Sequence, residues 1–200
     1  MDQIGSTLDL IKRKLDQYLC NRYAQQAEYV IVSNIVQDDG SVYESTKNKI
    51  VIFLANIQHE TTISTYNKNV PTSNNTYVTV APALYINLFV LFYANFSDAN
   101  YRQGLSFISD TISFFQQTPC FTKDNSPDLE PVIDKLTFDM VNLDASELNY
   151  LVGLAGVKYL PCVYYKIRML PFISDEIQGT TAGVQGLQNQ PVPDDAEDDS

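Results

Sequence analysis

The amino-acid sequence predicts a single α/β domain with a mixed, mainly antiparallel sheet of about five strands flanked by three helices. Two segments place apolar residues at spacings of three and four, which is typical of amphipathic helices, and a capping box marks the start of a third helix. Runs rich in β-branched and aromatic residues lie between them and are typical of strands. With 200 residues, 44% of them hydrophobic, the chain is long enough to bury a substantial core.

Residues 2–26 are predicted to form the first helix. Lys12 and Arg13 lie on or beside its polar face. They belong either to a plain solvated face or to a contact patch, and we name them as candidate interface residues. The apolar residues that predict this helix are Ile4, Leu8, Ile11, Leu15, Tyr18, Leu19 and Tyr23.

Three consecutive strands are predicted at residues 28–37, 49–64 and 84–93. The first is rich in β-branched residues, and the second has an apolar first half and a Thr-rich end that we expect to be exposed. Pro82 cannot donate a ladder hydrogen bond, so it is expected at a bulge or at the start of the third strand. Residues 66–75 have the Pro, Asn and Ser content of an extended loop.

The second helix is predicted to start at the capping residues Ser97 and Asp98 and to end near residue 117, before Pro119. Phe114 and Phe115 are adjacent, so their side chains point about 100° apart. We expect one of them in the core and the other at its margin or at a subunit contact. The expected inner face consists of Tyr101, Leu105, Ile108, Ile112 and Phe115.

The last three elements are a strand at residues 136–141, a helix at 145–154 and a strand at 162–170. Asp144 and Glu147 form a capping box for the helix. Alternation along the last strand divides it into a face of Val163, Tyr165, Ile167 and Met169 and a face of Tyr164, Lys166, Arg168 and Leu170. The first set is expected in the core. Lys166 and Arg168, expected to point toward solvent or an acidic neighbour, are the second pair of candidate interface residues.

We expect residues 1–173 to form the domain and residues 174–200 to form an acidic, flexible tail. Residues 178–200 hold five acidic residues and no Lys or Arg. The tail is either a solvated segment that keeps the protein soluble, or an arm that docks on a neighbouring subunit with Val184, Leu187 and Val192 as anchors. The first role is favoured because three anchors bury little apolar area.

Charge and composition exclude several partners. The net charge of −11 disfavours nucleic-acid binding, because an acidic surface repels phosphate. Residues 77–96 are uncharged over the length of a membrane span, but their polar residues and Pro82 favour a buried strand, so no membrane insertion is expected. The N-terminus has no apolar signal-peptide core, and three widely spaced cysteines indicate reduced thiols.

No catalytic, cofactor-binding or metal-binding residues are predicted, so we expect the protein not to be an enzyme. His59 is the only histidine and lacks the second histidine of an HExxH site. No Gly-rich phosphate loop is present, and Cys162 has no neighbouring base in sequence. Asp134 and Asp139 lie on opposite faces of the expected strand and cannot act as a pair.

Four stretches carry a resemblance to a known family: NKIVIFLANIQHETT (48–62), the strand-to-helix unit with its FFQQTPCF exit (83–121), LTFDMVNLDASELNYLVGLAG (136–156) and PCVYYKIRML (161–170). Together the chain resembles the cap, or tail-terminator, proteins of phage-tail-like contractile injection systems of the antifeeding-prophage type. The resemblance covers roughly residues 1–173, and its specificity lies in the order of these pieces. The tail matches none of the family's patterns.

The resemblance implies a tail-terminator-like subunit that forms a homo-hexameric ring. Such a ring would close the distal end of the inner tube and contact the last layer of sheath protein. Assembly would take place in the bacterial cytoplasm, within a particle that is later released or anchored. The alternative that we keep open is a soluble adaptor or scaffold that binds one protein partner without forming a ring.

Overall fold

The computed structural model describes residues 2–37, 39–62, 68–72, 76–80, 83–156, 159–173 and 177–182. The chain divides into two compact units, residues 1–64 with 83–172 and residues 65–82 with 173–200. Each unit is built around its own sheet.

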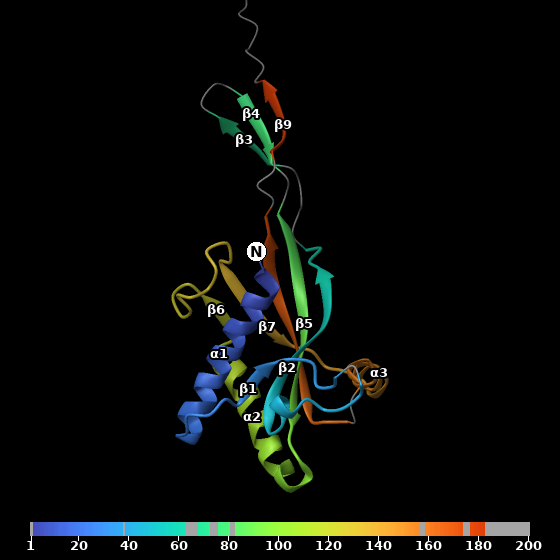
Figure 1. Ribbon diagram of the computed structural model, residues 1–200. Coiled ribbons are helices and arrows are strands. Elements are labelled where there is room, and N and C mark those ends of the chain that lie inside the picture. The colour runs from blue at the N-terminus through green and yellow to red at the C-terminus, as the bar shows by residue number, and fades with distance from the viewer. Residues whose placement is uncertain are drawn as a thin grey trace, which may run out of the picture. The chain divides into compact units, whose positions relative to one another are not determined.

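The sheet of the first unit has six strands in the order β1-β2-β5-β8-β7-β6 (Figure 1). Only β1 and β2 pair in parallel, and every other neighbouring pair is antiparallel. The predicted mixed, mainly antiparallel α/β sheet is therefore confirmed, with β6 as a further strand that is too short to give a periodic signal. The strands are β1 (Val30–Val32), β2 (Lys49–His59), β5 (Leu84–Asn95), β6 (Cys120–Thr122), β7 (Lys135–Met140) and β8 (Cys162–Phe172).

Three α-helices flank this sheet, as predicted: α1 (Gln3–Tyr23), α2 (Tyr101–Gln117) and α3 (Ala145–Ala155). Helices α1 and α2 lie together on one side of the sheet and α3 lies on the other (Figure 1). Short 3-10 turns occur at η1 (Glu44–Thr46) and η2 (Asp98–Asn100). None of the described helices combines the length and the apolarity needed to cross a membrane.

The helix ends follow local sequence signals in two cases out of three. Asp2 caps α1 by accepting a hydrogen bond from the N–H of Gly5. Asp144 and Glu147 form the predicted capping box of α3, which ends at Gly156 with a left-handed φ of 66°. The expected cap of α2 at Ser97 is wrong: η2 comes first, and no side chain caps the helix.

The main core lies between the sheet and helices α1 and α2. The Phe115 ring meets the Phe92 ring of β5 edge to face, with 5.1 Å between centroids, and also contacts Tyr165 of β8. Phe114 is buried as well, against Tyr18 of α1. The expectation that only one of Phe114 and Phe115 enters the core is therefore wrong, because α1 covers the second ring.

The inner face of α2 is rotated from the predicted one. Tyr101 and Leu105 are 49% and 41% exposed, whereas Phe107 is buried. At Gly104, an added Cβ would lie 3.1 Å from the Phe96 ring. The large aromatic residues and this close approach, rather than the aliphatic spacing, set which side of α2 faces the sheet.

On the opposite face of the sheet, a smaller apolar cluster packs under α3. Leu91 and Tyr93 of β5 and Tyr164 of β8 are buried there, and Leu151 of α3 packs against them. Phe89 continues this row along β5, but the next residue on the same face is Asn87. The apolar cluster therefore gives way to polar side chains farther along the sheet.

The second unit contains a three-stranded antiparallel sheet in the order β3-β4-β9. Its strands are β3 (Lys68–Thr72), β4 (Thr76–Val80) and β9 (Ile177–Ala182). Residues 66–75, expected as a loop, thus include β3, and residues 174–182, expected within the flexible tail, include β9. Pro71 is compatible with a strand here because β3 is at the edge of the sheet. Pro82 and residues 183–200 lie outside the described residues.

Candidate functional site

A row of polar and charged side chains crosses the sheet on the face that α3 partly covers. We call it the charged row, and it consists of Glu60, Asn87, Lys166, Arg168 and Asp139. Glu60 directly follows β2, Asn87 is on β5, Lys166 and Arg168 are on β8, and Asp139 is on β7. Lys166 lies directly opposite Asp139 in the β7–β8 register. Cross-strand pairing therefore brings residues from four separate segments onto one surface.

Glu60 is the centre of the charged row, and its side chain is only 5% exposed. Its Oε1 accepts hydrogen bonds from the hydroxyl of Thr62 at 2.6 Å and from the Thr62 N–H at 3.1 Å. Its Oε2 accepts from Nδ2 of Asn87 at 3.0 Å and from Nε and Nη2 of Arg168 at 3.2 and 3.0 Å. A buried carboxylate is tolerated only when it is paired in this way.

These contacts lower the pKa of Glu60 to about 2 from its ordinary value of 4.5. The largest cause is the hydrogen bond from the Thr62 hydroxyl, followed by the one from Asn87. Burial opposes the shift, because it disfavours the charged form. Glu60 is therefore ionised at neutral pH and pairs with the basic side chains of Arg168 and Lys166.

Lys166 and Arg168 lie on the face of β8 that the alternation predicted, opposite Val163, Tyr165 and Ile167. They do not simply point to solvent, because the buried Glu60 of the same chain is their shared partner, with Nζ of Lys166 at 4.0 Å. Arg168 also lies 3.8 Å from Asp139. About a quarter of the Lys166 side chain and a third of the Arg168 side chain remain exposed.

Leu170 was expected on the same face as Lys166 and Arg168, and this is wrong. Leu170 is fully buried in the main core. The β5–β8 register shifts between the pairs Ile86–Leu170 and Leu88–Ile167, so β8 contains one extra residue there. A bulge of this kind breaks the alternation and turns Leu170 inward.

Lys12 and Arg13 lie on α1, on the other side of the sheet, so the structure does not bring the two candidate pairs together. Nζ of Lys12 contacts Glu28 at 2.7 Å, and Nη2 of Arg13 contacts Asp128 at 2.9 Å. Hydrogen bonds from Lys12 and then Lys49 lower the pKa of Glu28 to about 2.

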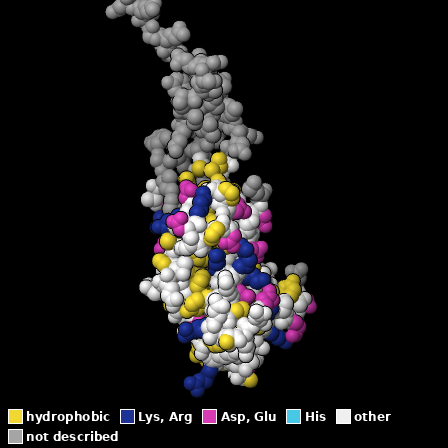
Figure 2. All heavy atoms as spheres, turned by 90° about the vertical axis from the view of Figure 1, so that its left-hand side faces the viewer, with side chains coloured by type: hydrophobic (Ala, Val, Ile, Leu, Met, Phe, Trp, Pro, Cys, Tyr) yellow, Lys and Arg dark blue, Asp and Glu magenta, His cyan; other side chains and the backbone are white. Residues whose placement is uncertain are grey.

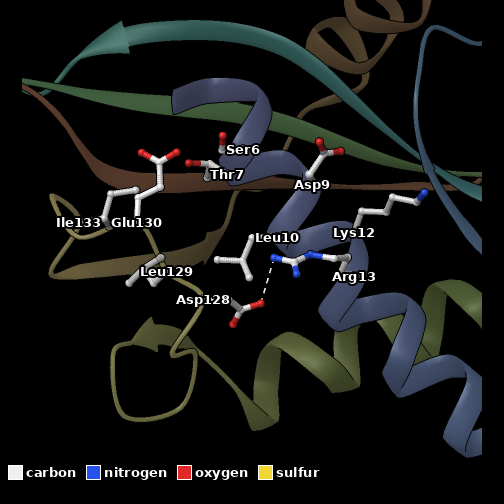
Figure 3. A pocket seen from close by; sticks show the side chains of 10 residues that line it. All are labelled: Ser6, Thr7, Asp9, Leu10, Lys12, Arg13, Asp128, Leu129, Glu130 and Ile133. Atoms are coloured by element: carbon white, nitrogen blue, oxygen red, sulfur yellow. Dashed lines mark ion pairs between the residues drawn. The ribbon is translucent and has the colours of Figure 1, made fainter. Parts of the chain in front are cut away.

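Beside α1 runs a groove of about 600 Å³ between the helix and residues 128–133. Arg13 reaches across it to Asp128, and Lys12, Asp9 and Glu130 add charges of both signs to its rim (Figure 3). The surrounding face also mixes basic and acidic side chains (Figure 2). The groove therefore has no single charge that would select one ligand.

Asp110 on α2 is a second buried carboxylate. Like Glu60, it is not among the residues predicted from the sequence. It accepts a hydrogen bond from the Tyr23 hydroxyl at 2.7 Å and pairs with Arg22 at 2.6 Å. Burial, followed by this hydrogen bond, raises the pKa of Tyr23 to about 12. Neither Glu60 nor Asp110 stands in a recognisable motif, because their partners are distant in sequence.

The described residues offer little for catalysis. They contain no group of three His, Cys, Asp or Glu side chains placed to hold a metal ion. Burial raises the pKa of the Cys162 thiol to about 11, which keeps it protonated at neutral pH. What the described surface can do chemically is hold oriented charges on a rigid sheet.

Comparison with known proteins identifies the fold. The family described as the Pvc16 N-terminal domain matches residues 7–185. The PVC sheath/tube terminator of an extracellular contractile injection system, in its extended state, is similar with a TM-score of 0.60 and 12% sequence identity, over 95% of this chain and 64% of that chain. The anti-feeding prophage cap (AFP tube terminating cap) is similar with a TM-score of 0.60 and 12% identity, over 92% of this chain and 60% of that chain.

No curated protein matches the sequence. The chain spans less than two thirds of the length of the two solved chains. At 12% identity, those chains establish a shared fold. The family match covers most of the sequence, and the chain therefore belongs to the Pvc16 N-terminal domain family.

Proposed function

We propose that this protein is a structural cap, or tail terminator, of a contractile injection system. It forms a ring, expected to be hexameric, that closes the distal end of the inner tube and contacts the last layer of sheath protein. The observation that carries the proposal is that this chain, over 95% and 92% of its length, is similar in fold to a sheath/tube terminator and to a tube terminating cap. We also propose that the protein is not an enzyme.

The architecture suits this role. A cap must keep its shape under the load of a contracting sheath, and the six-stranded sheet is packed between helices on one face and α3 on the other. The charged row ties β2, β5 and β8 together at a buried carboxylate. Such a body presents fixed surfaces to its neighbours.

We assign Lys12, Arg13, Lys166 and Arg168 to contacts with acidic groups of tube, sheath or neighbouring subunits. Arg13 is the best placed of the four, because its side chain is 60% exposed. Its pair with Asp128 is a surface ion pair, worth about 0–1 kcal/mol, so a partner carboxylate can replace Asp128 at little cost. Assembly in the bacterial cytoplasm, without membrane insertion, is part of the same proposal.

The test is polymerisation of the tube protein with and without this chain. A cap at tube ends stops elongation, so the added chain should shorten and narrow the tube-length distribution in electron micrographs. Arg13→Glu should weaken this effect without unfolding the protein. Lys47→Glu, the same charge reversal at a 54% exposed side chain that does not line the groove, is the matched control. Unchanged tube lengths, together with a chain that stays monomeric beside tube protein, would favour the adaptor alternative.

A further inference from the structure

β2 is much longer than the strand that covers its outer side. β1 pairs only with Ile50, Val51 and Ile52. On its other side, β2 stays paired with β5 as far as His59. Residues 53–59 therefore form an outer strand edge with no partner strand among the described residues, and in Figure 1 this part of β2 lies at the margin of the sheet. We call it the β2 edge.

Backbone groups on the β2 edge point away from the sheet. The N–H of Glu60 donates to the carbonyl of Tyr85 on the β5 side. In an antiparallel pair the direction alternates, so the N–H and C=O groups of His59 and Ile57 face outward. Accordingly, the Ile57 N–H donates its hydrogen bond to the side-chain Oδ1 of Asn56, at 2.8 Å, and not to a neighbouring strand.

The β2 edge lacks most of the usual protection against strand addition. Natural edges are commonly blocked by Lys, by Pro or by inward-pointing charge, and residues 53–59 contain none of these. A register shift between Leu54 and Asn56 is the one protective feature among them. Ile57, beyond that shift, is 45% exposed. An edge of this kind accepts an extended segment through main-chain hydrogen bonds.

We propose that residues 183–193 of a second copy of this chain add as a strand to the β2 edge. This segment begins directly after β9, which ends at Ala182, and it carries no charge, like the edge itself. Residues 183–190 contain no proline, so each of these eight residues has a backbone N–H that can donate a hydrogen bond. This length is enough to pair with the whole β2 edge, residues 53–59. The five acidic residues of the tail come after it.

The proposal deepens the cap function and rests on it, because it describes how neighbouring subunits of the ring are joined. The edge and the segment are different surfaces, so their contact is head-to-tail, as a closed ring requires. Pairing of two β2 edges would instead give a two-fold dimer. Main-chain hydrogen bonds would add binding free energy that the small apolar area of Val184, Leu187 and Val192 does not provide. The proposal therefore favours the docking arm over the solvated tail as the role of this segment.

Photo-crosslinking identifies the occupant. Ile57 is replaced by p-benzoylphenylalanine in the full chain, which is mixed with ¹⁵N-labelled unmodified chain and assembled on tube protein. After illumination, peptides from residues 183–193 carrying ¹⁵N should be joined to position 57. Crosslinks only to another copy's β2 edge, to tube or sheath protein, only within one chain, or none at all in assembled rings would overturn the proposal.

Two truncations provide the matched pair. Removal of residues 183–200 should raise the concentration needed for half-maximal ring assembly by about tenfold or more, whereas removal of the acidic residues 194–200 alone should leave it nearly unchanged. Ile57→Pro, at a position whose N–H does not serve the β2–β5 ladder, should act like the longer truncation, with its fold checked by circular dichroism. Equal assembly by both truncations would contradict the proposal.

The two proposals fail differently. If rings cap tubes but position 57 never crosslinks to residues 183–193, the cap function stands and the arm proposal falls. If no ring forms on tube protein, the cap function itself is wrong.

Discussion

Arg168 donates two hydrogen bonds to a single carboxylate oxygen of Glu60, although the two residues are 108 positions apart in sequence. The contact joins the end of β2 to β8 across β5, and Asn87 of β5 completes it. One buried carboxylate thereby fixes three strands relative to one another. The stability of this end of the sheet should depend on it.

Glu60→Gln keeps the shape of the side chain but removes its charge. Hydrogen bonds to charged groups contribute about 1.5–3 kcal/mol each, so the free energy of unfolding should fall by about that amount. Glu44→Gln is the control, because Glu44 is 81% exposed in a surface pair, and it should cost less than about 1 kcal/mol. Urea unfolding of both variants checks this, and equal losses would show that Glu60 is not structurally important.

Arg168→Glu should damage the fold far more than Lys166→Glu. The first places a second carboxylate against the buried Glu60, and breaking such a pair costs about 3–5 kcal/mol. Lys166→Glu also places a carboxylate near Glu60 and opposite Asp139, but Nζ of Lys166 is 4.0 Å from Glu60 and partly exposed, so this reversal should cost only about 1–2 kcal/mol. Thermal unfolding separates the two variants. Stability losses that are equal for both would contradict the assigned pairing.

Acid should destabilise the protein as pH falls from about 4.5 to about 2. The folded-state pKa of Glu60 is lowered to about 2, whereas the unfolded chain takes up the proton near the ordinary value of 4.5. The unfolded state therefore binds more protons in this range, and stability present above it is lost as pH falls. Urea unfolding between pH 6 and 2.5 should show this, with a smaller slope for Glu60→Gln. An unchanged slope in that variant would assign the pH dependence elsewhere.

The rotation of α2 can be tested by truncating its apolar side chains. Phe115→Ala and Phe114→Ala should each cost about 3–5 kcal/mol, because both rings are buried. Leu105→Ala, at a side chain that is 41% exposed, is the matched control and should cost less than about 1 kcal/mol. A large loss for Leu105→Ala with a small one for Phe114→Ala would restore the helix face expected from aliphatic spacing.

The elements that local patterns predict well are those whose signals lie within the element. The α1 periodicity and the Asp144–Glu147 capping box correspond to helices with nearly the expected bounds. The face of α2 was mispredicted because neighbours distant in sequence, such as Tyr18 against Phe114, decide which side is buried. β9 pairs with β4, which lies about 100 residues earlier in the chain, and periodicity within either segment does not reveal that pairing. β3 pairs with the adjacent β4, but its Pro and Asn content resembles that of a loop.

The candidate interface residues show a similar limit. Alternation correctly placed Lys166 and Arg168 on one face of β8, but it did not reveal that Glu60 lies beneath them. A lone Glu after a strand has no sequence pattern that marks it as buried. The bulge that turns Leu170 inward is equally invisible, because it is defined by the register with β5.

Cryo-electron microscopy of tubes assembled with this chain is the sharpest test of the proposed cap function. Tubes formed with the full chain should carry a ring of six copies at one end only. The six-stranded sheet should fit the density of each copy. Bare tube ends at saturating concentrations of the folded chain, or chain bound along the tube wall as single copies, would contradict the account.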